Sequence, residues 1–230
     1  MRKLPRYITK EEYEQMLDYI NERRVRASKL GKTNWERKWK EVALALILGF
    51  KSGMRISEIY GLKAFTTPCC NAVPEQRRIG KRLRRWFCSG CGKPQARGKL
   101  RRLDQNAWEI EPLTLTLEDI NRHQVIRMGK GKKERAIFLP LEVTPKALEL
   151  FPLKIARRSI QRTITVLAQK LFNKKITFHS LRHGFATHLV NKGVPLNEIQ
   201  MAMGHSSIAT TGIYLHANPT KVGEHIREVF

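Results

Sequence analysis

Two histidines and an arginine lie close together in "FHSLRHGFATHL", residues 178–189. His179, Arg182 and His183 have the spacing that places side chains along one edge of a helix. An imidazole and a guanidinium on that edge can hold one phosphate group together, although a solvated polar face fits the same spacing. The apolar positions beside them form a stripe that we expect to face the core: Phe178, Leu181, Phe185 and Leu189.

A second candidate phosphate ligand is Arg55 in "SGMRISE", just after a glycine and at the start of an expected helix. Glu58 follows three residues later, where its carboxylate can orient the guanidinium. The planar, permanently charged fork of arginine suits phosphate better than lysine does. An ordinary surface ion pair is the competing interpretation.

Three lysines, Lys130, Lys132 and Lys133, stand between two runs rich in β-formers, "HQVIRM" and "RAIFLP". This pattern predicts an antiparallel hairpin with a basic tip. Lys132 and Lys133 are candidate DNA-binding residues, although a charged hairpin tip is by itself weak evidence, since a solvated turn has the same composition.

An isolated tyrosine, Tyr214, follows His205 by nine residues in "MGHSSIATTGIYLH". A phenol of pKa near 10 is a poor nucleophile at neutral pH, so it needs a nearby base and a positive field to react. Two arginines, two histidines and a lysine elsewhere in the chain can supply both. A core tyrosine with a bonded hydroxyl is the alternative.

These four segments, in this order and wording, resemble the tyrosine recombinase (phage integrase) family, including Xer-type recombinases and archaeal viral integrases. The resemblance covers the catalytic domain, from about residue 7 to about residue 216. It implies a fold that is α+β and mainly helical, with a small antiparallel sheet or hairpin. It also implies DNA cleavage and joining, and tetramers assembled on DNA.

The resemblance also assigns roles. Arg55 and Arg182 would hold the nonbridging oxygens of the scissile phosphate, with His179 and His205 bonding the same group and assisting proton transfer. Lys130 would protonate the leaving 5'-oxygen, and Tyr214 would form a 3'-phosphotyrosyl link. Preorganised cations stabilise the charge that develops in such a step, so no catalytic metal is expected. Supporting positions are Glu58 and His183.

All four cysteines fall in a segment from Thr67 to Arg102 that has no place in the family pattern. Cys88 and Cys91 form a C-x2-C pair, whereas Cys69 and Cys70 are adjacent. A structural Zn²⁺ in a zinc-ribbon-like insert is our main expectation. Free thiols and a disulfide remain alternatives.

The same insert is strongly basic and contains Trp86 and Phe87, which suggests an added DNA-binding module. Its candidate phosphate ligands are Arg77, Arg78, Lys81, Arg82, Arg84 and Arg85. We therefore divide the chain into a catalytic domain at 1–66 and 103–230 and an insert at 67–102. Relatives place a core-binding domain before the catalytic domain, whereas here the catalytic pattern begins almost at residue 1; either a fragment or a compact enzyme is consistent with this.

The composition agrees with a nucleic-acid partner. The chain of 230 residues carries 44 Lys and Arg against 20 Asp and Glu, a formal charge of +24. Such a balance implies a polyanion, and the longest apolar run, "VALALILGF" at 42–50, is far shorter than a membrane span. We expect a reducing, cytoplasmic location with access to DNA, in a host cell if a virus or plasmid encodes the chain.

Helices are expected on both sides of the insert. Thr9 and Glu12 are expected to form a capping box before the first helix. Asn34 is the expected cap of the second helix, which should end near Gly53. A short third helix, "ISEIYGL", should follow. Later helices should start at Thr144 or Pro145, at Ser159, and in the segment that ends at Gly193. "PLNEIQMAMG", "SSIATTGIY" and the tail from 219 to 230 complete the set; the tail could pack on its own domain or on a neighbouring subunit.

A site-specific recombinase or integrase is the leading functional interpretation. A type IB topoisomerase would use the same residue types, and a noncatalytic DNA-binding regulator would use the insert alone. Relaxation of supercoils without a preferred site would favour the topoisomerase, and DNA binding without a covalent adduct would favour the regulator.

Overall fold

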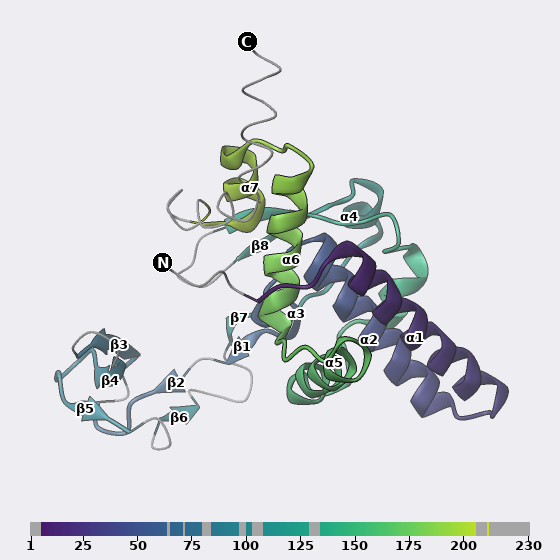
Figure 1. Ribbon diagram of the computed structural model, residues 1–230. Coiled ribbons are helices and arrows are strands. Elements are labelled where there is room, and N and C mark those ends of the chain that lie inside the picture. Colours follow the sequence, from purple (N-terminus) through teal and green to yellow (C-terminus); the bar gives the residue numbers. More distant parts are fainter. Residues whose placement is uncertain are drawn as a thin grey trace, which may run out of the picture. The chain divides into compact units, whose positions relative to one another are not determined.

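The chain divides into two compact units (Figure 1). The computed structural model describes residues 6–63, 65–70, 72–79, 84–96, 100–102, 108–128, 134–205 and 211. Unit 1 is Met1–Tyr60 with Pro112–Phe230, and unit 2 is Gly61–Glu111. Unit 2 therefore extends beyond both ends of the cysteine segment at 67–102.

Two long helices, α1 (Lys10–Lys29) and α2 (Thr33–Lys51), lie side by side in unit 1 (Figure 1). The predicted capping box at Thr9 and Glu12 is confirmed, since each residue's side chain accepts the other's backbone N–H. The predicted cap at Asn34 is wrong. The backbone N–H of Trp35 and of Glu36 both donate to the carbonyl of Lys32, so the helix already begins at Thr33.

The apolar run of α2 supplies much of the core. From Val42 to Phe50 every residue is buried except the half-buried Ala43. The run packs against α1, α5 (Arg157–Phe172) and α6 (Phe178–Asn191). None of the helices in the described ranges has both the length and the apolarity needed to cross a membrane.

A short hairpin and three short helical segments complete the centre of unit 1. The predicted hairpin is confirmed as β8 (Gln124–Met128) paired antiparallel with β9 (Glu134–Phe138), whereas its tip at 129–133 lies outside the described residues. The flanking helices are α3 (Ile56–Tyr60) and α4 (Leu117–Asn121). The helix predicted from "TPKALELF" is a 3₁₀ helix, η2 (Pro145–Leu150), rather than an α-helix.

Between residues 157 and 203 unit 1 is mainly helical, as predicted, whereas the tail from 219 to 230 lies outside the described residues. α5 begins at Arg157 and not at Ser159, because the N–H of Ser159 already donates to the carbonyl of Ala156 within the first turn. α6 ends before Gly193, as expected, and α7 (Leu196–Met203) follows. The segment "SSIATTGIY" lies outside the described residues, apart from Thr211.

The apolar stripe of α6 divides between two clusters. Phe178 and Leu181 are fully buried in the main core, which draws on α1, α2, α5 and the hairpin. Phe185 and Leu189 are half-buried and pack against a smaller cluster at the junction with α7. The face expected to be buried is therefore buried, but against two separate sets of partners.

Unit 2 is built from short antiparallel strands. Its largest sheet has the order β3 (Pro74–Arg78), β4 (Arg84–Cys88) and β5 (Pro94–Gln95). Two further pairs join β1 (Leu62–Lys63) to β7 (Trp108–Ile110) and β2 (Phe65–Thr66) to β6 (Arg101–Arg102). Its chain thus leaves unit 1 after α3 and returns before α4.

Candidate active site

Arg55 and Glu58 form a compact pair at the start of α3. The backbone N–H of Arg55 donates to Glu58 Oε2 over 2.6 Å, and Arg55 Nη1 donates to Oε1 over 2.8 Å. The carboxylate is fully buried, whereas 29% of the arginine side chain is exposed. Glu58 therefore anchors Arg55 from the protein interior and leaves the guanidinium partly exposed to solvent.

Arg182 is the largest fully buried side chain in the described residues, with 1% exposure. Its burial excludes the solvated polar face, the competing interpretation, at this position. Arg182 Nη1 donates to the carbonyl of Gly53 over 2.6 Å, and Nη2 donates to the carbonyl of Met203. The turn before α3 and the end of α7 enclose the guanidinium, since their backbone carbonyls provide acceptors that helical periodicity does not reveal.

Arg135, on β9, is an unexpected third arginine. Its Nη2 donates to Glu58 Oε2 over 2.7 Å and its Nε to Oε1 over 3.2 Å, a bidentate ion pair. It also donates to the carbonyls of Gly53 and Ala202. Strand alternation could have revealed it, because Arg135 and Ile137 share the inward face of β9, where a charge requires a buried partner.

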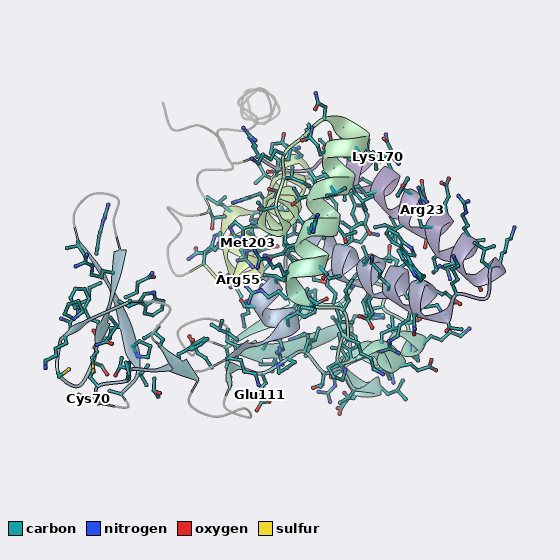
Figure 2. The ribbon with its side chains drawn as sticks, turned by 90° about the horizontal axis from the view of Figure 1, so that it is seen from below. Arg23, Arg55, Cys70, Glu111, Lys170 and Met203 are labelled. Atoms are coloured by element: carbon teal, nitrogen blue, oxygen red, sulfur yellow. The ribbon has the colours of Figure 1, made fainter. Side chains whose placement is uncertain are left out.

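Figure 2 shows Arg55 and Met203 close together, at the start of α3 and the end of α7. Arg182 donates to the backbone carbonyls of Gly53 and Met203, so its guanidinium lies between these two regions. The site thus joins segments that are about 150 positions apart in the sequence.

His179 and His183 lie on the same edge of α6, as expected, with ring centroids 4.5 Å apart and nearly perpendicular planes. His205 follows α7, and its Nδ1 lies 3.0 Å from Thr211 Oγ1. The backbone N–H of His205 donates to the Gln200 carbonyl, and the Gln200 side chain donates back to the His205 carbonyl. These bonds hold the loop that carries His205 against α7.

Burial and the nearby arginines lower the pKa of these histidines. Burial is the larger cause at each, followed for His179 and His205 by the charges of Arg182 and Arg55. The pKa falls to about 4 for both His205 and His183; at His183 burial is the largest cause, followed by the electrostatic effects of His179 and Arg182. All three imidazoles are therefore neutral at pH 7 and can accept a proton or a hydrogen bond.

Glu58 remains ionised because its arginine partners outweigh its burial. Burial raises its pKa, but the hydrogen bonds and charges of Arg135 and Arg55 lower it further. The site therefore contains three guanidinium groups, one carboxylate and neutral imidazoles. This arrangement has an excess of positive charge, which suits a phosphodiester.

Several predicted site residues cannot be placed. Lys130, Lys132, Lys133 and Tyr214 lie outside the described residues, as do Lys81, Arg82 and the side chain of Arg84. Their assigned roles remain predictions.

The basic residues of unit 2 that are described lie on its largest sheet. Arg77, Arg78 and Arg85 are exposed, and Arg77 pairs with Arg85 across β3 and β4. Arg77 also lies over the ring of Phe87, 5.3 Å from its centroid, and bonds Glu75. Directly opposed like charges destabilise a sheet, so a bound anion would relieve the repulsion between Arg77 and Arg85.

The four cysteines of unit 2 converge. All four Sγ atoms lie within 4.8 Å of one another, and those of Cys69 and Cys91 are 3.6 Å apart. Figure 2 shows yellow sulfur atoms around the labelled Cys70. The hydroxyl of Thr67 donates to Cys88 Sγ and, with backbone N–H groups of Cys91 and Gly90, lowers the pKa of that thiol to about 6. A thiol that ionises readily is a better metal ligand.

Part of unit 1 is similar in sequence to known proteins. Residues 149–221 match the family described as the phage integrase family. The chain is 33% identical over 138 residues to tyrosine recombinase XerD of Haemophilus ducreyi and 34% identical over 143 residues to XerD of Pasteurella multocida. These matches cover 49% and 51% of this chain and 46% and 48% of the relatives, so the chain spans about half of their length.

Two solved structures share the fold. The crystal structure of XerA recombinase superposes with a TM-score of 0.55 at 18% identity, covering 99% of this chain and 64% of that one. XerH site-specific recombinase bound to its difH substrate gives 0.52 at 20% identity, covering 98% of this chain and 54% of that one. The mainly helical fold with small antiparallel sheets is thus shared with both.

Proposed function

The chain contains a catalytic-domain sequence of the tyrosine recombinase, or phage integrase, family, and on that premise we propose that it is a site-specific DNA recombinase. The observation that carries this proposal is the convergence of Arg55, Arg182 and His205 from three separate elements. These side chains interact electrostatically, since the charges of both arginines lower the pKa of His205. XerH, which shares the fold, has been solved on its DNA substrate.

In the proposed reaction, the Tyr214 oxygen attacks a backbone phosphorus and forms a 3'-phosphotyrosyl ester. The bond from phosphorus to the 5'-oxygen breaks, and Lys130 gives a proton to that oxygen. A 5'-hydroxyl from another strand then attacks the ester, which releases Tyr214 and rejoins the DNA. The chain needs no external energy source because the ester retains the energy of the phosphodiester.

Each described residue has a distinct task in this scheme. Arg55 and Arg182 bind the nonbridging oxygens and stabilise the charge that develops on them. His179 and His205, neutral at pH 7, hydrogen-bond the same phosphate and take part in moving the tyrosine proton. Since only 1% of Arg182 is exposed, the site must open locally before this guanidinium can contact DNA.

A covalent adduct is the decisive test. Duplexes that the protein binds are first selected from a random library, then prepared with a nick beside each candidate cleavage position. On a denaturing gel we expect a protein-linked DNA band with the wild-type chain and none with Tyr214→Phe. If the protein binds the duplexes but forms no adduct at any nicked position, a noncatalytic regulator is favoured. Relaxation of supercoiled DNA that lacks the selected site would favour a topoisomerase.

We further propose that unit 2 binds DNA outside the active site. The exposed arginines of β3 and β4 support this, together with the basic residues Lys81, Arg82 and Arg84 in the sequence. Such contacts would add affinity for the DNA backbone without base readout. Assembly as a tetramer on DNA belongs to the same proposal, and its test is the mass of the complex formed on a duplex that contains two sites.

A structural Zn²⁺ held by Cys69, Cys70, Cys88 and Cys91 is the finer proposal for the cysteine cluster. Tetrahedral Zn–S bonds of about 2.3 Å place sulfurs roughly 3.8 Å apart, close to the 3.6 Å between Cys69 and Cys91. A disulfide needs about 2.05 Å. Native mass spectrometry should find one zinc per chain and none in Cys88→Ser; a metal-free mass lighter by two hydrogen atoms would indicate an oxidised disulfide instead.

A further inference from the structure

The buried Arg135 has no assigned part in the reaction, although it contacts the carboxylate that anchors Arg55. We propose that Arg135 is a positioning residue. It balances the negative charge of Glu58 from inside the protein, so that Glu58 orients Arg55 without cancelling the positive field of Arg55 at the phosphate. This inference rests on the proposed recombinase function. It concerns a residue that touches no substrate in the proposed scheme.

The geometry gives Arg135 contacts with three segments at once. Its guanidinium bonds both oxygens of Glu58 on α3, the carbonyl of Gly53 before α3, and the carbonyl of Ala202 on α7. Only 6% of its side chain is exposed, so these bonds are made away from water. Arg135 therefore ties the hairpin to the two segments that carry Arg55 and His205.

Gly204 shows how closely α7 ends against this side chain. Its backbone has a φ of +56°, and an added Cβ would lie 2.4 Å from Arg135 Cδ. Glycine is thus required both for the backbone turn and for the approach of the arginine stem. The residue that follows is His205, so the position of this histidine depends on the packing of Arg135.

Charge balance explains why one arginine is not enough. The buried Glu58 carboxylate would draw Arg55 into a closed ion pair if Arg55 were its sole cation, and the field at the phosphate would fall. Arg135 supplies a second, better buried cation in bidentate geometry. Arg55 can then remain 29% exposed and present a net positive charge to DNA.

The experiment compares single-turnover cleavage by wild type, Arg135→Gln, Arg135→Lys and the double variant Glu58→Gln/Arg135→Gln. Arg122→Gln is the matched control, since this arginine is 73% exposed and pairs only with Glu118 among the described ion pairs. We expect Arg135→Gln to slow adduct formation by about 10- to 100-fold, as is typical for partners that orient reacting groups. The dissociation constant for DNA should change less than about threefold by the same reasoning, because Arg135 is buried.

The double variant separates positioning from a merely structural role. Removing the Glu58 charge frees Arg55, so the double variant should form the adduct faster than Arg135→Gln alone, and Arg135→Lys should also recover part of the rate. If the double variant is slower than Arg135→Gln, or if Arg135→Gln is folded and cleaves at the wild-type rate, the proposal is wrong.

A second readout needs no activity. The pKa of His205, followed by NMR, should rise in Arg135→Gln, because one of the cations that lower it is gone and Glu58 is less neutralised. An unchanged His205 titration in a folded variant would overturn the proposal even if no DNA substrate were cleaved. Absence of an adduct from the wild-type chain, with the expected His205 shift, would instead contradict only the recombinase function.

Discussion

At the residue scale, buried charge dominates this protein. Arg182, Arg135 and Glu58 are all nearly inaccessible to solvent, and each is compensated by groups from other elements. An unpaired charge at any of these positions costs several kcal/mol, so the folded state requires the whole set. Stability and the geometry of the candidate active site are therefore coupled.

Arg182→Lys tests that coupling. A lysine keeps the charge but cannot donate in one plane to both Gly53 and Met203, so we expect a loss of about 1–3 kcal/mol in the free energy of unfolding and no detectable adduct. Urea denaturation and the suicide-substrate gel measure the two effects. Arg122→Lys, on the surface, should change neither; equal stability of both variants would contradict the assigned bonds.

Stability should also fall in acid because of the buried histidines. The pKa is about 4 for His183 and His205 in the folded chain and about 6.5 when unfolded. Between pH 4 and pH 6.5 the unfolded chain binds more protons than the folded chain. The free energy of unfolding therefore decreases as the pH falls from 6.5 toward 4. The slope is at most about 1.4 kcal/mol per pH unit for each histidine.

Urea denaturation at constant ionic strength from pH 7.5 to pH 5 measures this slope. His183→Gln should make the dependence shallower. His123→Asn is the control, because His123 is exposed and asparagine tolerates its positive φ. A slope unaffected by His183→Gln would show that this imidazole is not titrating as expected.

At the element scale, α6 is the helix that connects core and site. Its Phe178 and Leu181 lie in the main core, whereas Arg182, next to Leu181, donates to the backbone of two other segments. Close packing on both sides fixes the rotation of α6, and the rotation decides where His179 and Arg182 point. At Gly184, α6 closely approaches the backbone segment that contains Ile8.

Gly184→Ala distinguishes packing from helix propensity. Propensity alone would stabilise α6 by about 1 kcal/mol, but the new Cβ would lie 2.4 Å from the carbonyl oxygen of Ile8 and 2.8 Å from Phe50. Because the first contact is with backbone, we expect net destabilisation in thermal or urea denaturation. The exposed Gln15→Ala on α1 is the control and should be neutral or slightly stabilising; a stabilised Gly184→Ala would disprove the close approach.

At the scale of the whole molecule, the chain contains two units that are stabilised by different interactions. Unit 1 has a large apolar core. Among its described residues, unit 2 has short strands, exposed arginines and the cysteine cluster. So small a unit usually needs a metal or disulfides to remain folded.

Removal of the proposed Zn²⁺ from the cysteine cluster should therefore affect the two units unequally. With a chelator we expect unit 2 to unfold while unit 1 keeps its structure, because their stabilising interactions differ. Trp86 and Trp108 lie in unit 2 and Trp35 and Trp39 in unit 1, so tryptophan fluorescence of Trp35→Phe/Trp39→Phe and of Trp86→Phe/Trp108→Phe reports each unit separately. Equal loss of both signals would mean that the units do not unfold independently.

DNA affinity should depend steeply on salt through unit 2. Replacing Arg77 and Arg85 by glutamine should lower the slope of log K against log salt by about 1 for each arginine, because each would release counterions from one phosphate. Filter binding or fluorescence anisotropy over a salt series measures this. Arg122→Gln should leave the slope unchanged, and an unchanged slope in the double variant would remove unit 2 from the DNA interface.

Local patterns in the sequence determined much of what the protein is. The capping box at Thr9, the hairpin at 124–138, the helix at 178–191 and the pairing of Arg55 with Glu58 all depend on neighbours within a few positions, which spacing and residue type reveal. The motif order likewise predicted a resemblance to the phage integrase family, which residues 149–221 match. The tertiary structure alone decided that Arg182 is buried and that Arg135 contacts the Glu58 carboxylate. These outcomes depend on carbonyls and carboxylates that the fold brings from distant segments, and no local periodicity encodes such partners.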